Sequence, residues 1–351
     1  MRFSSRDKTK SEIVFAVPSK GSLYEGTLAF LKLAGVPVIY GNQRQYTARL
    51  GGVDGISVLF QRAEEIPTKV ASGAADLGIT GEDLFREQFD QSDEILLALR
   101  DLGYGHARLV VAVPNTWIDV SSMEDLAELA LSFRMKHKRN LRIASKFSNL
   151  SRGFLAKHNI VDYSLVESLG ATESAPTSGV ADLVIDLTSS GKTLSENHLK
   201  VLNDGTVISS QACLIVSRRI AGWDKEKLER LEILLDLIES YLRGRDTYNL
   251  QAMVHRSKLA ELTGLSHPWR LAYSIPTDEL TSVKAKREPF VVIRITCPCN
   301  HLHDVIRQLR SSGADEVIVT QPEYVFRDQS ESFQNLRHIL KKGGSAERTQ
   351  D

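Results

Sequence analysis

The sequence predicts an α/β protein, because strand-like and helix-like segments alternate along most of the chain. Apolar runs such as EIVFAVP (Glu12–Pro18) and DLVIDL (Asp182–Leu187) are typical of strands buried in a sheet. The amphipathic segments between them are typical of helices that cover mostly parallel sheets. Beyond a long charged helix, Trp223–Arg245, the order becomes βαββαβ, which indicates a smaller ferredoxin-like domain.

Each element follows from its local pattern of apolar residues. In the larger region we expect strands at Glu12–Pro18, Ile56–Phe60, Ala75–Thr80, Ala107–Pro114, Leu141–Phe147, Tyr163–Leu169 and Asp182–Leu187. Helices are expected there at Leu23–Gly35, Ala63–Ser72, Gly81–Glu87, Met123–His137, Asn149–His158 and Glu173–Val180. The smaller region should have strands at Tyr248–His255, Trp269–Ile275, Pro289–Thr296 and Glu316–Phe326, and helices at Ser257–Thr263 and His301–Ser312.

The composition argues against several classes of protein. The chain has 351 residues, and its 44 Lys and Arg balance 44 Asp and Glu. Proteins dedicated to nucleic acids or membrane surfaces need a strong positive field, so we expect neither partner. No apolar run approaches the roughly 20 residues of a membrane span. Three cysteines are too few for a disulfide framework, so a cytoplasmic protein is expected.

The most specific motif is DLTSSGKTL, which begins at Asp186 and follows a buried strand. Backbone N–H groups in such a turn can surround one phosphate, and hydroxyl groups can add to them. The hydroxyl groups would come from Thr188, Ser189, Ser190 and Thr193. Gly191 would let the backbone approach the anion, and Lys192 could add positive charge. The GKT triplet does not make a Walker A motif, because Asp186 stands where that motif needs a glycine.

Asp186 adds a carboxylate at a fixed distance from this turn. Such a group can accept hydrogen bonds from ribose hydroxyls and can stabilise positive charge at an anomeric carbon. The alternative interpretation is an ordinary polar turn, in which Asp186 only caps the segment that follows.

Two further glycine turns follow predicted strands. The first contains Lys20 and Gly21, and the second contains Gly81, Glu82 and Asp83. Ligands of α/β proteins bind at the carboxyl ends of strands, where both turns are expected. Each turn alone is also a common feature of α/β folds without a ligand.

A fourth motif combines Cys297, Cys299, His301 and His303. The spacing does not match the Cys-x₂₋₄-Cys pairs of structural zinc sites. Two histidines two residues apart would also diverge around a helix. We therefore interpret the motif as a corner between a strand and a helix.

Six segments together resemble a known family. In chain order they are VPSKGSLYE, FQRAEEIPTKVASGAADLGITGEDL, LGYGHARLVVAVP, LRIASKFSNLSRGFLAKHNI, GATESAP and GVADLVIDLTSSGKTLSENHL. Over about Ile13–Val216 they resemble ATP phosphoribosyltransferase, a pentosyltransferase and the first enzyme of histidine biosynthesis. The resemblance implies a two-lobed core similar to type II periplasmic binding proteins. The chain would cross between the lobes near Arg108–Val113 and return near Asp186.

The implied division of the chain follows from these crossings. We expect an N-terminal tail at 1–11, a first lobe at 12–108 and 187–218, a second lobe at 109–186, a connecting helix at 219–246, a ferredoxin-like regulatory domain at 247–330 and a C-terminal extension at 331–351. The additional domain makes the chain resemble the long form of the family. That form assembles as hexamers, and a dimer is the alternative.

The resemblance also implies the substrates and their contacts. Phosphoribosyl pyrophosphate would place its 5′-phosphate at Thr188–Thr193 and its ribose near Asp182 and Asp186, with Mg²⁺ on the pyrophosphate. The sequence does not identify the ligands of this metal. N1 of ATP would attack the anomeric carbon and expel pyrophosphate. The nucleotide contacts would be Lys20, Gly21, Gly81, Glu82, Asp83, Arg152 and Glu173.

L-Histidine is the implied feedback inhibitor, although the sequence departs from the family near its site. Ser266–Arg270 (SHPWR) stands where many regulatory domains have Glu-Ser-Pro-Thr. Two other functions use the same scaffold, namely a small-molecule sensor and an inactive subunit kept for oligomerisation. A sensor of amino acids would not need Asp186 beside a hydroxyl-rich turn. An inactive subunit would not need the acid, this turn and the Lys20–Gly21 turn together.

Overall fold

The fold is described from a computed structural model of the chain. The structure describes residues 12–41, 48–90, 92–168, 170–258, 290–314 and 316–346. The chain forms two compact units. The first contains Met1–Lys32, Val36–Leu231 and Ser332–Asp351, and the second contains Leu33–Gly35 and Glu232–Glu331.

The first unit contains a seven-stranded sheet with the order β2-β3-β4-β1-β5-β12-β6. Its strands are β1 (Ile13–Pro18), β2 (Val38–Tyr40), β3 (Ala48–Leu50), β4 (Ile56–Gln61), β5 (Leu77–Gly81), β6 (Ile95–Leu99) and β12 (Ala212–Ser217). The associated helices are α1 (Ser22–Leu33), α2 (Ile66–Ser72) and α3 (Glu82–Phe89). Strand β1 runs parallel to β4 and β5, so the carboxyl ends of all three meet at one edge of the sheet.

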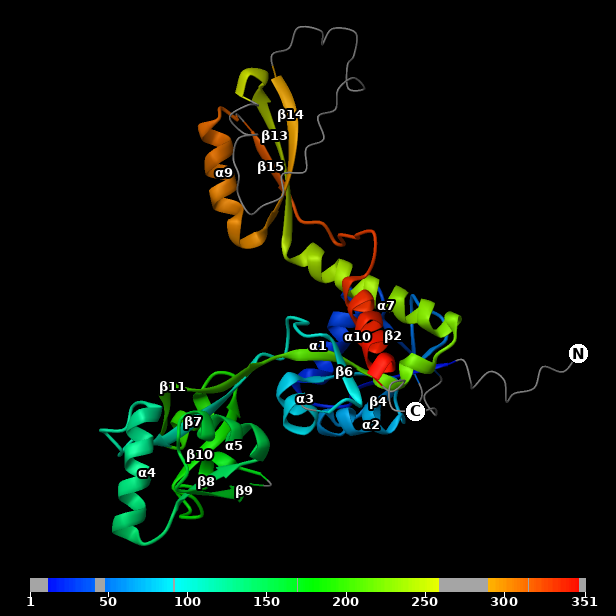
Figure 1. The fold of residues 1–351 in the computed structure, drawn as a ribbon. Coiled ribbons are helices and arrows are strands. Elements are labelled where there is room, and N and C mark those ends of the chain that lie inside the picture. The colour runs from blue at the N-terminus through cyan, green and yellow to red at the C-terminus, as the bar shows by residue number, and fades with distance from the viewer. Residues whose placement is uncertain are drawn as a thin grey trace, which may run out of the picture. The chain divides into compact units, whose positions relative to one another are not determined.

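The same unit contains a five-stranded sheet with the order β11-β7-β10-β8-β9 (Figure 1). Its strands are β7 (Ala107–Pro114), β8 (Leu141–Ser145), β9 (Tyr163–Glu167), β10 (Leu183–Thr188) and β11 (Leu199–Ser210). The associated helices are α4 (Met123–His137), α5 (Ser148–Lys157) and α6 (Lys192–Glu196). Ser122 and Asp125 form a capping box that begins α4. Fully buried side chains such as Val111, Leu126 and Ile143 form the core of this lobe.

The two sheets confirm the predicted two-lobed α/β core, but the return of the chain to the first sheet was placed wrongly. Strand β11 pairs with β7 from Leu199 opposite Pro114 to Ser210 opposite Ala107. Residues 187–210 therefore belong to the second lobe, and the chain returns at Gln211 instead of Asp186. Strands β11 and β12 are separated only by this residue, so the sequence presents them as one extended run.

Local differences are confined to short or edge elements. The apolar pattern does not separate β2, β3 and β6 from their surroundings. The helix expected at Glu173–Val180 is only a 3₁₀ turn at Thr172–Ser174. Pro176 and Gly179 interrupt this segment, which explains why no longer helix forms.

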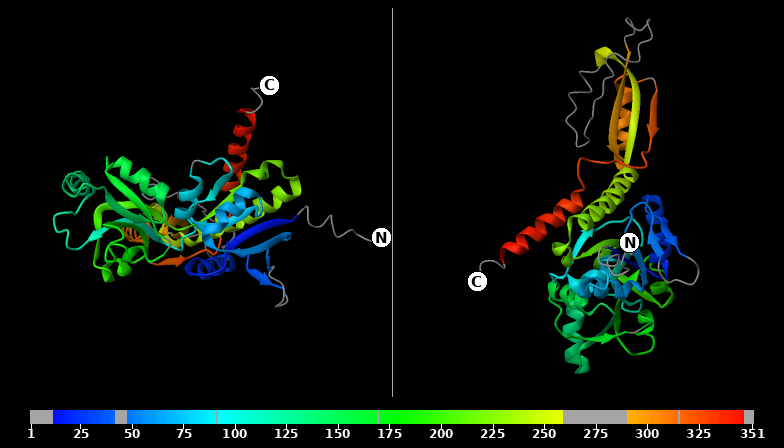
Figure 2. Two further views of the ribbon diagram at one scale, coloured as in Figure 1. Left: turned by 90° about the horizontal axis from the view of Figure 1, so that it is seen from below. Right: turned by 90° about the vertical axis from the view of Figure 1, so that its right-hand side faces the viewer.

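The second unit contains an antiparallel sheet of three described strands with the order β14-β13-β15. They are β13 (Thr247–His255), β14 (Phe290–Pro298) and β15 (Val317–Thr320). Helix α9 (Leu302–Ser311) lies against this sheet (Figure 2). Its Val305 and Leu309 belong to one buried cluster with Leu250 and Ile293 of the sheet. The arrangement is consistent with a ferredoxin-like domain. The strand expected at Trp269–Ile275 and most of the helix expected at Ser257–Thr263 lie outside the described residues.

Two helices complete the chain. The predicted connecting helix is α7 (Lys225–Arg245), and the C-terminal extension contains α10 (Glu331–Ala346), whose Phe333 and Leu336 are buried. Cys297 is buried near the end of β14, and the chain turns there into α9 as expected for this corner. Within the described ranges, no helix is both long and apolar enough to cross a membrane.

Candidate active site

A cavity of about 890 Å³ in the first unit brings the carboxyl ends of strands from both lobes together. From the first lobe it is lined by Lys20–Leu23 after β1, Arg62–Glu64 after β4, and Gly81, Asp83 and Leu84 after β5. From the second lobe it is lined by Lys146 and Phe147 after β8, and by Asp186–Ser189 at the end of β10. Ligands of α/β proteins bind at such strand ends, so this cavity is the candidate active site.

The predicted phosphate turn lies at the rim of this cavity and is ordered by its own side chains. Thr188 and Ser189 line the cavity, whereas Ser190, Gly191, Lys192 and Thr193 continue into α6. The N–H of Gly191 donates to Oγ1 of Thr188 at 2.8 Å. The φ of Gly191 is 76°, a left-handed conformation that favours glycine. The first N–H groups of α6 have no partner within the helix, which leaves donors for an anion.

Lys192 is directed to another partner. Its Nζ lies 3.8 Å from Oε1 of Glu196, and its N–H makes a long bond of 3.4 Å to Oγ of Ser190. Its side chain is 78% exposed. The structure therefore gives Lys192 a solvent-facing ion pair instead of a place in the cavity.

Asp186 is the half-buried carboxyl group of the second lobe in this cavity. Burial raises its pKa above the ordinary value, and a hydrogen bond to the N–H of Leu187 opposes this shift. The negative charge of Glu173 raises the pKa further, and the positive charge of Lys146 lowers it. Glu173 and Lys146 thus act electrostatically on Asp186, although only Lys146 lines the cavity.

Asp182 lies at the other end of β10 and does not join Asp186. Arg139 donates to both of its carboxylate oxygens at 2.6 and 2.9 Å, and the N–H of Arg142 donates at 2.8 Å. Burial raises the pKa of Asp182, but the bonds from Arg139 and Arg142 outweigh it and hold the pKa well below its ordinary value. The structure therefore corrects the expected contact of Asp182 with ribose, because this acid is part of an ion-pair cluster outside the cavity.

The turn after β5 separates the roles of two neighbouring acids. Asp83 is buried and lines the cavity, where Oγ of Ser210 donates to its Oδ1 at 2.5 Å and accepts its N–H at 3.0 Å. Burial raises the pKa of Asp83, and the bond from Ser210 lowers it. A Cβ on Gly81 would lie 2.3 Å from Oδ1 of Asp83, so only glycine leaves room for this carboxylate.

Glu82 is directed away from the cavity. Its Oε1 pairs with Arg86 at 2.7 Å and with Arg100 at 3.5 Å. Its N–H donates to the carbonyl of Gln211 at 3.0 Å. Glu82, expected at the nucleotide, is therefore buried against two arginines and does not line the cavity.

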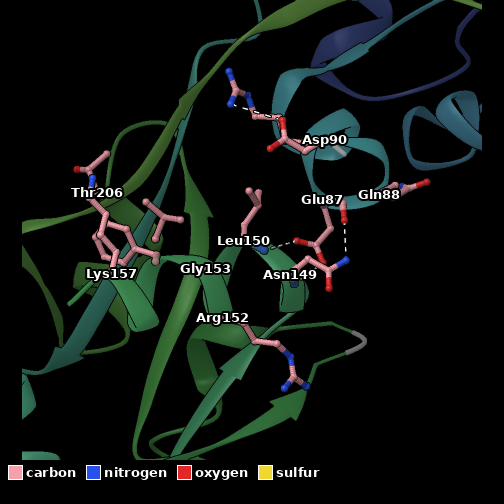
Figure 3. A pocket seen from close by; sticks show the side chains of 12 residues that line it. Glu87, Gln88, Asp90, Asn149, Leu150, Arg152, Gly153, Lys157 and Thr206 are labelled. Carbon is pink, nitrogen blue, oxygen red and sulfur yellow. Dashed lines mark hydrogen bonds and ion pairs between the residues drawn. The ribbon is translucent and has the colours of Figure 1, made fainter. Parts of the chain in front are cut away.

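Arg152 lines a second cavity of about 840 Å³, which shares Glu87 and Gln88 with the first (Figure 3). The figure shows Arg152 on α5, with its side chain directed away from Glu87 of α3. Arg152 therefore belongs to the neighbouring cavity, whereas Lys20 and Gly21 line the first one.

Several lining residues were missed by the sequence analysis. They are Arg62, Glu64, Glu87, Gln88, Gly105, His106 and Lys146. Most of them come just after a strand or just before one, which was the signal that could have identified them. Lys146, for example, directly follows the buried strand LRIAS.

Carboxylates from both lobes line this cavity, and they are the candidate ligands of a metal ion. They belong to Glu64, Asp83, Glu87 and Asp186. In the described part of the chain, no group of three or more His, Cys, Asp or Glu side chains gathers as a metal site would. Mg²⁺ is commonly held by one or two carboxylates together with substrate phosphates. The donor set fits an ion that binds together with a phosphorylated substrate.

Comparisons with known proteins identify the family. A family model described as ATP phosphoribosyltransferase matches residues 62–239. ATP phosphoribosyltransferase of Rhodopseudomonas palustris (strain HaA2) is 39% identical over 333 residues, which cover 94% of this chain and 98% of the relative. The enzyme of Bradyrhizobium sp. (strain ORS 278) is 38% identical over 330 residues, with coverages of 94% and 98%.

Among solved structures, the ATP phosphoribosyl transferase (HisG:HisZ) complex from Thermotoga maritima has a similar chain. It aligns with a TM-score of 0.47 and 24% identity, over 65% of this chain and 98% of that chain. The sequence relatives match nearly the whole chain, and the family model covers the second lobe and part of the first. The chain therefore belongs to the family of ATP phosphoribosyltransferases.

Proposed function

We propose that this chain transfers the phosphoribosyl group of phosphoribosyl pyrophosphate to N1 of ATP. The products are phosphoribosyl-ATP and pyrophosphate, and the reaction is the first step of L-histidine biosynthesis. The observation that carries the proposal is Asp186, which stands in a cavity directly before the Thr188–Thr193 turn in a chain of this family. Neither a sensor nor an inactive subunit needs this combination.

The residues of the second lobe would bind the phosphoribosyl donor. The 5′-phosphate would accept hydrogen bonds from the N–H groups at the start of α6 and from the hydroxyl groups of the turn. Asp186 would stabilise positive charge at the anomeric carbon while the bond to pyrophosphate breaks. Lys146 lies near Asp186 and would contribute positive charge toward the pyrophosphate.

The residues of the first lobe would bind ATP. Lys20 and Gly21 after β1, and Gly81 and Asp83 after β5, would form the nucleotide side of the cavity. Arg152 and Glu173 of the second lobe do not line this cavity, so they are not among the proposed ATP contacts. The reaction needs no covalent intermediate, because correct placement of N1 against the anomeric carbon supplies much of the rate acceleration.

Mg²⁺ is the proposed cofactor, held mainly by substrate phosphate oxygens, with Asp186 as the carboxylate that would face it. When bound, the ion would neutralise charge on the leaving pyrophosphate. The purified chain should therefore lose activity in the presence of EDTA and regain it when Mg²⁺ is added.

The regulatory proposals concern the second unit. We propose that L-histidine inhibits the enzyme through the ferredoxin-like domain, and that the chain assembles as a hexamer in the cytoplasm. The three-stranded sheet with α9 supports a separate folded domain for this role. Ser266–Arg270 lies outside the described residues. Saturating L-histidine should lower activity and raise the melting temperature, and no change in either would rule out the inhibition.

The decisive experiment is the synthesis of phosphoribosyl-ATP by the purified chain alone. ATP, phosphoribosyl pyrophosphate, Mg²⁺ and pyrophosphatase are supplied, and the product is measured by its absorbance. Product would establish the activity and show that no second subunit is required. If both substrates stabilise the chain against heat and no product forms, the chain is a sensor or needs a partner. If neither substrate binds, the proposal is wrong.

A further inference from the structure

Glu87 of α3 contacts the first turn of α5 across the boundary between the two lobes. The N–H of Asn149 donates to its Oε1 at 2.8 Å, and the N–H of Leu150 donates to its Oε2 at 3.0 Å. The side-chain amide of Asn149 donates to the backbone carbonyl of Glu87 at 2.8 Å. Figure 3 shows this arrangement, in which the carboxylate faces the start of α5.

These bonds replace a local cap that α5 does not have. Phe147 precedes the helix, and its side chain cannot accept a hydrogen bond from the first turn. The first N–H groups of a helix have no partner within it, and a carboxylate beside them is favourable. Glu87 thus supplies from one lobe the cap of a helix that belongs to the other lobe.

The position of α5 matters for the cavity, because the segment that begins the helix lines it. Lys146 and Phe147 stand between β8 and α5, and Glu87 itself lines the cavity. The proposed ATP contacts Gly81 and Asp83 lie just before Glu87, on the turn that begins α3. The contact of α3 with α5 therefore fixes the separation of the ATP side of the cavity from the Lys146–Asp186 side.

We propose that Glu87 is a positioning residue, which holds the two lobes at the separation needed for N1 of ATP to reach the anomeric carbon. The inference rests on the proposed function. Each substrate has its contacts on one lobe, so binding of a single substrate does not require the contact. The reaction between two bound substrates does require it, because a displacement of about 1 Å can cost about 10²-fold in rate.

Three variants test the role. Glu87→Ala removes the carboxylate, and Glu87→Gln keeps its size with a single acceptor oxygen. Asp90→Asn is the matched control, because it removes a carboxylate just beyond the same end of α3. This carboxylate pairs with Arg86 at 3.7 Å. The full chain is used, and kcat, the Kd of each substrate alone and the amide exchange of Asn149 and Leu150 are measured.

In Glu87→Ala, kcat should fall about 10²-fold, and the two amides should exchange faster while both Kd values stay unchanged. The kcat and the amide exchange of Glu87→Gln should lie between those of Glu87→Ala and the wild type. Both quantities should equal the wild-type values in Asp90→Asn. Unchanged kcat with faster amide exchange would overturn the proposal. So would lower kcat with unchanged exchange, since Glu87 would then act on a substrate directly. An inactive wild type would instead contradict the proposed function, and the amide exchange would still report the contact.

Discussion

The bond between Ser210 and Asp83 offers the sharpest test of how the site is built. Ser210→Ala removes a donor to the carboxylate at 2.5 Å and an acceptor for the N–H of Asp83 at 3.0 Å. Both residues are about 95% buried, so water does not replace either bond. A bond to a charged group contributes about 1.5–3 kcal/mol and a neutral bond about 0.5–1.5 kcal/mol. We therefore expect a loss of about 2–4 kcal/mol in the free energy of unfolding.

A double-mutant cycle with Asp83→Asn separates the charged bond from the rest. With a neutral Asn at position 83, Ser210→Ala should cost about 1 kcal/mol less, because the charged bond is already absent. Urea unfolding of the full chain can be followed through Trp117, which packs against the core of the second lobe. Ser209→Ala at the exposed neighbouring position is the control. A loss below about 1 kcal/mol for Ser210→Ala, or strict additivity in the cycle, would refute the reasoning.

Three further predictions concern the strand β10 and the turn after it. Gly191→Val should raise the KM for phosphoribosyl pyrophosphate, because a β-branched residue is strained at a φ of 76°; an unchanged KM would remove this turn from the phosphate site. Asp186→Asn should lower kcat about 10²-fold. The same variant should raise the melting temperature at pH 7, because burial raises the pKa of this carboxyl and its charge destabilises the fold. The gain in melting temperature should shrink as the pH falls toward about 4. A lower melting temperature of Asp186→Asn at pH 7 would contradict this reasoning. Asp182→Asn should leave kcat unchanged and cost about 1–2 kcal/mol of stability at neutral pH, since its partners Arg139 and Arg142 are partly exposed. The pKa of Asp182 is lowered by folding, so this cost should shrink progressively as the pH falls below about 4. A drop in kcat would indicate that Asp182 does act in the active site.

The sequence was informative wherever one strand or helix could be judged by itself. EIVFAVP became the buried strand β1, and Trp223–Arg245 became α7 with almost the same bounds. The strand ends after β1, β5 and β10 also reached the cavity as expected, because parallel strands bring their carboxyl ends together. Local pattern and strand direction therefore predict the place of the cavity.

Partners across the fold could not be predicted in the same way. No local pattern indicates that Glu82 faces Arg86 and Arg100, or that Glu87 caps α5. Asp182 and Asp186, however, could have been separated by geometry alone. Four residues of a strand span about 13 Å, so two acids at this spacing cannot both contact one ribose.

The contacts of the candidate site also run through the two crossings between the lobes. Gln211 stands at the return crossing, where its Oε1 accepts the N–H of Gly103 at 3.0 Å and its Nε2 donates to Asp101 at 2.9 Å. Both partners lie between β6 and β7, where the chain first crosses from the first lobe to the second. One side chain therefore connects the two crossings. Ser210, the residue before Gln211, holds Asp83 in the cavity. The crossings therefore connect the lobes and also position the ATP side of the cavity. A substitution at Gln211 should alter ATP binding, although the Gln211 side chain does not line the cavity.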